Sequence, residues 1–448
     1  MKASYLLFAA ALIASQTSRP SLAHAAETLS ASGVQEDAFG NDDPFAVIGA
    51  ENKLPHQDAV ESGIAGNKPQ ARAEVFFKAY NADINMNSRV NPGNRIQKLK
   101  EITGAAETRV TISDSMAAEN TLRWLFKGFA AGPDYHEADG TQRGKESRID
   151  ELFVDWRSER LFVSAGKRRV NWGHAQGFNP VNVVAPQRDP LNPGYQSEGQ
   201  PLVWGSFSGA IGVIDIILTR NYDENWNSDK YRWGLKLGYS GSDIDFAVYY
   251  FDGEEYSAGK PFERMLGASF AAEAAPGVTL YAEGARVARN YRPYYSAAGS
   301  ALNTGEGYFQ GVIGSSISLG GKSSMFIEYL YNGQGYSNDE RGNYLRAVDA
   351  MLANSAAQAI SGDFTLAGLN RRYLLASVKK EYREKYNFGI SVIVAEDKSN
   401  STRAEVSYAI SDYYEAQVSY LDYSGGMDSE FGANPYRGLL EISLKASF

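Results

Sequence analysis

The segment 166–180, GKRRVNWGHAQGFNP, gathers side chains that a binding site or a catalytic pocket would use. Three consecutive cations, Lys167, Arg168 and Arg169, precede Trp172. Cations beside aromatic rings bind carboxylates and sugar rings through charge-assisted hydrogen bonds and stacking. The same cations can instead pair with acids of neighbouring strands. The segment is therefore a candidate ligand clamp, a candidate catalytic pocket, or the point where a strand gives way to a loop that folds into a pore.

A second group of cations among aromatic rings lies at 284–295, GARVARNYRPYY. Its members are Arg286, Arg289 and Arg292, interleaved with Tyr291, Tyr294 and Tyr295. The same two interpretations apply to this group: contacts with a carboxylate or sugar ligand, or pairing with acids nearby.

Catalytic and metal sites have weaker support in the sequence. His174, with Asn171 close to it, is the candidate for an outer-membrane hydrolase. No G-x-S-x-G motif is present, and His136-Glu137 is followed by no second His at the spacing of H-E-x-x-H. We therefore expect no enzyme, no catalytic residue, no metal and no cofactor.

The first 25 residues have the pattern of a cleaved secretory signal. Lys2 precedes the apolar run YLLFAAALIA, and Ala23-His24-Ala25 supplies a small-x-small cleavage site. The run is too short for a membrane-spanning helix. The chain has no cysteine, so disulfides do not contribute to its stability. We expect an exported protein of a Gram-negative cell.

Residues 26–70 form an acidic segment without periodicity. Between 27 and 70 the chain carries eight acids and two bases, and the remainder is close to charge balance. We expect a flexible segment, either a disordered periplasmic tail or one that enters the lumen or binds a periplasmic partner. The charge distribution predicts no nucleic-acid partner.

Most of the remaining chain alternates apolar and polar residues with a period of two. In ELFVDWRS, Leu152, Val154 and Trp156 share one face, whereas Asp155 and Arg157 share the other. One face suits lipid and the other suits water, as in the strands of a transmembrane barrel. A soluble sandwich would show the same alternation.

The connections between strands distinguish these two folds. Short turns and longer segments alternate along the chain, which is the outer-membrane pattern of short periplasmic turns and long external loops. The longer segments are 85–106, 132–147, 173–199, 221–229, 253–262, 289–306, 333–368, 397–401 and 424–436. Splitting 201–220 into a hairpin at Ser208-Gly209-Ala210 preserves the alternation.

The predicted fold is therefore all-β: a transmembrane antiparallel β-barrel of the outer-membrane type over residues 71–448. We predict 18 strands, with 16 as the alternative. The predicted strands are 72–84, 107–116, 120–131, 148–158, 160–171, 201–208, 211–220, 230–240, 243–253, 263–274, 277–288, 307–319, 322–332, 369–381, 385–396, 402–411, 413–423 and 437–448.

The chain ends on an alternating apolar strand with a terminal aromatic residue. The alternating positions are Leu440, Ile442, Leu444, Ala446 and Phe448. This end resembles the C-terminal assembly signal of outer-membrane barrels. The resemblance implies recognition by the barrel-insertion machinery and integration into outer-membrane lipid. Physically, the last strand must pair with the first one to close the barrel.

A barrel of this size leaves an aqueous path unless loops fill it. Charged residues on the inferred inward faces are Glu151, Asp155, Arg157, Asp215, Arg232, Lys236, Asp245, Glu283, Glu328 and Lys379. They either pair with one another and stiffen the wall, or form a selective binding track. The loop 173–199 contains four prolines, so it is extended, and it either folds into the pore or caps its mouth. Segment 333–368 has helical spacing at Leu345, Val348, Met351, Leu352 and Ala356.

The strand–turn–strand DELFVDWRSERLFVSAGKRRVNWG resembles that of alginate-export-type channels and related porin-like families. The shared elements are Phe153-Val154-Asp155, Gly166-Lys167-Arg168, Trp172-Gly173, Asn179-Pro180 and Trp204. The match covers about 60 residues, and Lys and Arg stand where the family more usually has Arg and Gln. The resemblance implies passive conduction or export of a solute or polymer.

The sequence thus predicts a porin-like outer-membrane channel for a hydrophilic solute or polysaccharide. The alternatives are a structural or adhesive barrel without transport and an outer-membrane lipid or ester hydrolase. The candidate pore-lining or substrate-contact residues are Lys167, Arg168, Arg169, Trp172, Asp155, Arg157, Arg286 and Arg289.

Overall fold

The computed structural model describes most of the chain from residue 69 onward. The described residues are 69–117, 121–136, 142–184, 189–192, 198–220, 231–241, 243–252, 264–290, 292, 294–296, 301–302, 306–320, 322–352 and 368–448. The predicted signal at 1–25 and nearly all of the acidic segment 26–70 lie outside them.

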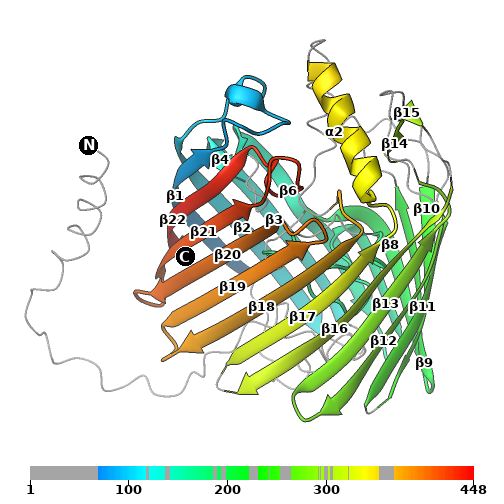
Figure 1. The fold of residues 1–448 in the computed structure, drawn as a ribbon. Helices are drawn as coiled ribbons and strands as arrows, with labels where there is room; N and C mark the ends of the chain where they lie inside the picture. The colour runs from blue at the N-terminus through cyan, green and yellow to red at the C-terminus, as the bar shows by residue number, and fades with distance from the viewer. Residues whose placement is uncertain are drawn as a thin grey trace, which may run out of the picture. The chain divides into compact units, whose positions relative to one another are not determined.

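Within the described residues, 18 strands form one antiparallel sheet that closes on itself (Figure 1). The predicted fold class is confirmed, and 18 rather than 16 is the strand number. The strands are β1 (Gln70–Ile84), β2 (Ile102–Ala117), β3 (Thr121–Pro133), β6 (Glu146–Arg157), β7 (Leu161–Arg168), β8 (Gln200–Gly209), β9 (Gly212–Arg220), β10 (Tyr231–Ser240), β11 (Ile244–Asp252), β12 (Met265–Ala275), β13 (Val278–Val287), β16 (Tyr308–Gly320), β17 (Ser323–Asn332), β18 (Arg372–Tyr382), β19 (Tyr386–Ala395), β20 (Asn400–Ala409), β21 (Tyr414–Ser424) and β22 (Tyr436–Ser447).

The last strand closes the barrel against the first. β22 pairs antiparallel with β1, with Leu444 opposite Phe77 and Ile442 opposite Ala79. The Phe448 amide continues the ladder by donating to the carbonyl of Ala73 at 2.8 Å. Closure removes the two sheet edges that would otherwise be left unpaired in lipid.

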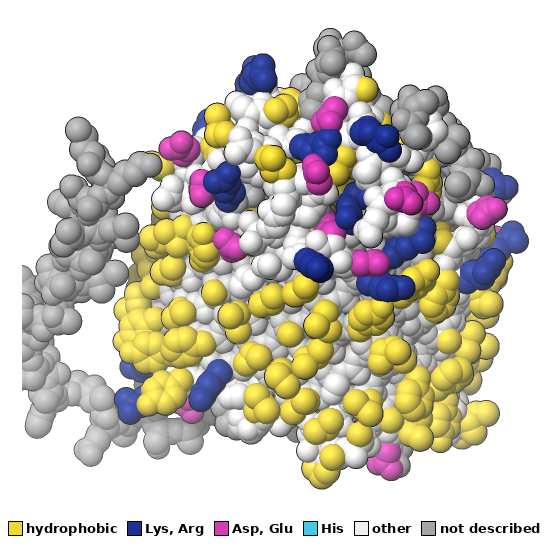
Figure 2. Space-filling view, in the orientation of Figure 1, with side chains coloured by type: hydrophobic (Ala, Val, Ile, Leu, Met, Phe, Trp, Pro, Cys, Tyr) yellow, Lys and Arg dark blue, Asp and Glu magenta, His cyan; other side chains and the backbone are white. Residues whose placement is uncertain are grey.

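Side chains alternate between a lipid-facing outer surface and the barrel interior. On β17, Ile327 and Tyr329 are exposed on the outside, whereas Phe326 and Glu328 are buried inside. Figure 2 shows the outcome: hydrophobic side chains cover the strand-bearing part of the surface, and charged side chains gather above them. This is the apolar band of an outer-membrane-type barrel.

Short and long connections alternate as predicted, and individual strand bounds differ from the prediction by up to five residues. β8 and β9 form the hairpin predicted at Ser208-Gly209-Ala210. β2 begins at Ile102, five residues before the predicted start at 107, and β7 ends at Arg168 instead of 171. The segment predicted as a longer loop at 397–401 is a tight turn between Ala395 and Asn400, closed by the Lys398 amide on the carbonyl of Ala395 at 3.0 Å.

The end of the barrel that carries the long connections, which we call the external end, has further short elements (Figure 1). They are η1 (Pro92–Asn94), β4 (Tyr135–His136), β5 (Gln142–Arg143), β14 (Tyr294–Tyr295), β15 (Ala301–Leu302) and α2 (Asn338–Leu352). None of the helices in the described part of the chain is long and apolar enough to cross a membrane.

Helix α2 confirms the helix predicted within 333–368. Ser337 and Glu340 cap its first turn reciprocally: the Ser337 amide donates to Glu340 Oε2 at 2.7 Å, and the Glu340 amide to Ser337 Oγ at 3.4 Å. Leu345 and Val348, from the predicted apolar face, are buried against Tyr294 and Tyr295. Ala356 lies outside the described residues.

Candidate channel constriction

The chain leaves the barrel wall where β7 ends. Gly166 has a φ of 131°, in the region that favours glycine, and a Cβ there would lie 2.2 Å from the carbonyl oxygen of Leu152. Two residues later the strand ends at Arg168. The chain then enters the lumen, and we call residues 169–184 the inner loop.

Glu283 of β13 provides the first anchor for the inner loop. Its Oε1 accepts hydrogen bonds from the amides of His174 and Ala175, the second at 2.7 Å. Gly173 has a φ of 98°, and a Cβ at this position would lie 2.3 Å from the same oxygen. Glycine thus allows the backbone to approach the carboxylate.

Glu328 of β17 provides the second anchor and is fully buried. It accepts the amides of Gln176 at 2.5 Å, Gly177 at 3.2 Å and Phe178 at 2.8 Å. The hydroxyl of Tyr281 also donates to it, at 2.8 Å. Four donors satisfy a carboxylate that burial would otherwise penalise heavily.

Apolar contacts secure the inner loop between these anchors. Trp172 is 1% exposed, and its ring centroid lies 5.6 Å from that of Tyr249 on β11. Val181 is buried in the same cluster, and the ring of Phe178 lies 6.1 Å from that of Tyr373 on β18. The strands β9–β13 and β16–β18 thus form a loop-bearing wall.

The opposite side of the lumen is lined by charges instead. We call the strands β20–β22, β1–β3 and β6 the charged wall. Lys78 Nζ lies 2.8 Å from Glu107 and 3.4 Å from Glu441. Other inward ion pairs of this wall are Arg109–Glu107, Lys127–Glu151, Arg403–Glu405, Lys445–Glu74 and Lys445–Glu415. The inner loop thus covers one side of the lumen and inward ion pairs gather on the other, although Lys236 and Asp215 of the loop-bearing wall also pair, at 3.7 Å.

Arg168 and Asp155 meet on the inner face as an ion pair. The guanidinium of Arg168 also lies over three rings, 4.5 Å from Phe153, 5.4 Å from Phe162 and 5.2 Å from Trp204. Stacking and pairing together hold this cation rigidly at the point where the inner loop begins.

The other candidate residues of segment 166–180 point to different sides of the barrel wall. Lys167 lies on the outer face and pairs with Glu198, because neighbouring residues of a strand point to opposite sides. Arg169 pairs with Glu151 at 3.0 Å on the inside. Trp172, which is part of the inner loop, is buried against Tyr249 of the wall instead of facing the open lumen.

The remaining candidates lie apart from this site. Arg157 is on the inner face of β6, towards the turn into β7. Arg286 is exposed on the outer face of β13, opposite the lipid-facing Leu266 and Phe309, so it does not line the lumen. Arg289 is exposed beyond the end of that strand, and Tyr291 is outside the described residues.

The role of Glu283 and Glu328 was missed at the level of sequence. Both were predicted to point inward, but as members of ion pairs or of a selective binding track; instead they accept backbone amides of the inner loop. The available signal was the segment WGHAQG, where two glycines expose successive N–H groups that favour an anion.

The hydrolase candidate His174 is placed by its backbone, which donates to Glu283. Burial lowers the pKa of its imidazole to about 4, so the ring is neutral at pH 7. Within the described part of the chain, no group of three or more His, Cys, Asp or Glu side chains is arranged to hold a metal.

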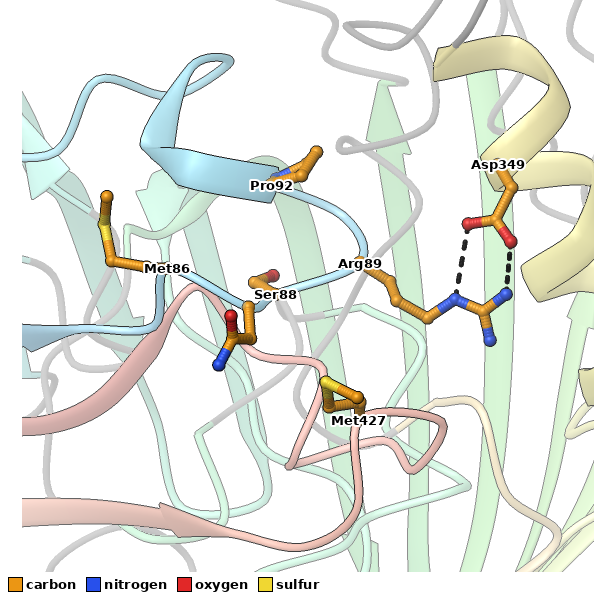
Figure 3. A pocket seen from close by; sticks show the side chains of 7 residues that line it. Met86, Ser88, Arg89, Pro92, Asp349 and Met427 are labelled. Atoms are coloured by element: carbon orange, nitrogen blue, oxygen red, sulfur yellow. Dashed lines mark hydrogen bonds and ion pairs between the residues drawn. The ribbon is translucent and has the colours of Figure 1, made fainter.

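Three external segments meet at Arg89, in the loop between β1 and β2 (Figure 3). Arg89 Nε donates to Asp349 of α2 at 3.3 Å, and the guanidinium also pairs with Asp428 in the β21–β22 loop. Met86 and Met427 line a pocket of about 410 Å³ beside this contact. The ion pairs are solvent-exposed, so salt screens them.

A buried carboxylate joins the β21–β22 loop to the residues that lead into β18 and to the β19–β20 turn. Glu430 accepts the amide of Gly368 at 3.0 Å, the side-chain amide of Asn370 at 2.7 Å and the hydroxyl of Tyr373 at 2.7 Å. Burial raises the pKa of Glu430 to about 7. Its own amide donates to Asp397 at 2.8 Å.

No protein-family model and no curated protein matches the chain. Similar solved structures include two mutants of the porin of Rhodopseudomonas blastica, each with three substitutions. Each mutant is 9% identical to this chain, the match covers 85% of this chain and 100% of the mutant, and the TM-score is 0.45.

Proposed function

We propose that the chain is a porin-like channel of the bacterial outer membrane, exported by a cleaved signal, through which a hydrophilic solute passes passively. The observation that carries this proposal is the inner loop bound to Glu283 and Glu328 inside a closed 18-stranded barrel. A loop fixed across a wide barrel narrows the lumen to a defined constriction.

The charged wall supports an aqueous path on the side of the lumen that faces away from the anchors of the inner loop. Its charges pair with one another, and one of these pairs is partly exposed: the side chains of Lys445 and Glu415 are 27% and 32% exposed. Paired charges of both signs favour polar solutes without excluding either sign of ion.

The proposed cargo is a small hydrophilic solute, with a polysaccharide as the alternative that the sequence resemblance suggests. The inner loop occupies space that a polymer chain would need. Adding neutral oligosaccharides of increasing length to one side of a conducting bilayer tests this choice. In a channel for small solutes, block of the ion current should decrease as the oligosaccharide becomes longer. In a polysaccharide channel, block should increase with oligosaccharide length.

The proposal is tested by single-channel recording of the purified protein in planar bilayers. We expect stepwise ion conductance from the full mature chain and from a variant lacking residues 26–68. Heat-modifiable migration on gels verifies that each sample contains folded barrel. A folded barrel without conductance in both forms would overturn the channel and favour the structural or adhesive barrel, which the apolar packing of the inner loop would also suit.

A further inference from the structure

A cavity of about 680 Å³ opens on the outer surface of the barrel, next to the point where β7 leaves the wall. Its volume is within the roughly 300 to 1,000 Å³ of sites for small ligands. The apolar lining residues are Ile149, Leu152, Val203, Leu218 and Tyr231. They come from β6, β8, β9 and β10, which lie around the C-terminal end of β7.

The cavity exists because the strand ladder is interrupted there. Pairing between β6 and β7 stops at Leu152–Lys167, although β6 continues along β3 as far as Glu146. A register shift in β6 lies just beyond, between its pairings with Lys127 and Gly128. Leu202 and Thr219, which are buried towards the interior, also line the cavity. The cavity is therefore a notch cut into the wall instead of a shallow furrow on it.

The floor of the notch faces lipid. Leu152, Val203 and Leu218 are 49%, 49% and 46% exposed on the outer face of the barrel. Tyr231 is 63% exposed at the external end of β10, the position of an interfacial aromatic girdle. Because an outer-membrane-type barrel meets bilayer on this face, the phase in contact with the floor is the outer leaflet.

Charged groups lie at one side of the same notch. Lys167 and Arg148 are lining cations, and Glu198 is a lining acid. Lys167 is paired with Glu198, and Arg148 Nε donates to Asp150 at 2.7 Å behind the notch. A flexible Lys ammonium with a partly exposed partner can exchange that partner for a second anion. Arg148 also pairs with Glu146 and lies over the buried ring of Phe129, so Lys167 is the lining cation that a lipid phosphate would meet.

We propose that the notch binds one phosphate-bearing lipid of the outer leaflet, with an acyl chain on the apolar floor and the phosphate at Lys167. The apolar floor removes the chain from contact with mobile lipids, and the charged side fixes the headgroup by a charge-assisted hydrogen bond. This site rests on the membrane location of the barrel and is independent of conduction.

Native mass spectrometry of the detergent-purified protein, titrated with phosphatidylglycerol or with diacylglycerol, which has the acyl chains but no phosphate, tests the site. We expect one tightly retained phosphatidylglycerol per barrel and about tenfold weaker retention of diacylglycerol, the effect of one charge-assisted contact. Lys167→Gln should weaken retention of phosphatidylglycerol about tenfold and leave diacylglycerol unchanged.

Leu218→Trp fills the floor and should abolish the retained lipid. The matched control is Leu374→Trp, on the outer face of β18 and 48% exposed, which should retain it. Unchanged gel mobility on heating shows that both variants are folded. Equal retention by the two Trp variants, or equal retention of the two lipids by the unsubstituted protein, would overturn the proposal, whatever the bilayer recordings show.

Discussion

The two sides of the lumen hold their polar groups in different ways. On the loop-bearing wall, Glu283 and Glu328 are buried and accept backbone amides from a segment more than 100 residues away in sequence. On the charged wall, Lys445 pairs with Glu415 of the adjacent strand, and both side chains remain partly exposed. Buried carboxylates with fixed donors are costly to disrupt, whereas partly exposed ion pairs contribute little. The loop-bearing wall therefore fixes the position of the inner loop, and the charged wall sets the electrostatics of the proposed aqueous path.

The largest expected effect is the loss of a buried anchor. Glu328→Ala leaves four donors without an acceptor, at roughly 1 to 3 kcal/mol each, so docking of the inner loop should weaken by about 4 to 12 kcal/mol. Limited proteolysis should then cut within 169–184 in the folded barrel. Glu328→Gln, which keeps one acceptor oxygen, should be cut more slowly. Resistance equal to the unsubstituted protein would remove Glu328 as an anchor.

The apolar part of the same wall is expected to rank second. Trp172→Ala empties the space beside Tyr249 and should cost about 3 to 5 kcal/mol. The matched control is Trp156→Ala, which removes the same side chain from the lipid face. The stability of both variants is measured as the denaturant concentration at the unfolding midpoint, with the folded barrel identified by its heat-modifiable migration on gels. If Trp156→Ala is the more damaging change, the inner loop contributes little to stability.

The external end offers a pH-dependent comparison at Glu430, which faces Tyr373 and lies close to Asp397. Its raised pKa of about 7 means that the folded protein binds a proton that the unfolded chain, near pKa 4.5, does not. The resulting stabilisation, about 3 kcal/mol, is complete below pH 4.5 and is lost as pH rises through 7.

Protease resistance of the external segments should therefore fall between pH 5 and pH 8. In Glu430→Gln, which cannot titrate, this pH dependence should disappear, although the baseline resistance is lower because the new amide faces donors. A pH profile that is the same in both proteins would show that Glu430 does not titrate in this range.

The smallest expected effect belongs to the charged wall. Lys445→Gln should change stability by no more than about 0.5 kcal/mol, since its pairs are partly exposed. It should, however, shift the reversal potential towards cation selectivity, because it removes the cation that pairs with Glu415. A large loss of stability without a change in selectivity would reverse the roles assigned to the two walls.

The barrel itself was predictable because alternation and connection parity are local patterns. The hairpin at Ser208-Gly209-Ala210 and the closure by the strand ending at Phe448 followed from them. Period two also places Lys167 opposite Arg168, and Arg286 opposite Glu283, so their grouping as lumen residues ignored the pattern that predicted the strands.

The path of the inner loop was not predictable in the same way. Its direction depends on the φ of Gly166 and on acceptors in β13 and β17, which no local pattern links to it. Four prolines predicted that segment 173–199 is extended, but an extended loop can cap a mouth as well as enter it. Recognition of Phe448 by the insertion machinery stays a prediction; deletion of this residue should lower membrane assembly.

The central claim, that the inner loop is the constriction of a channel, is tested most directly by single-channel recordings of the Glu283→Ala/Glu328→Ala double variant beside the unsubstituted protein. Without either anchor, the loop should swing free and raise the conductance while making it noisier. The control is Lys445→Gln, for which conductance should remain within the range of the unsubstituted protein. Identical steady conductance in the double variant and the unsubstituted protein would contradict the claim.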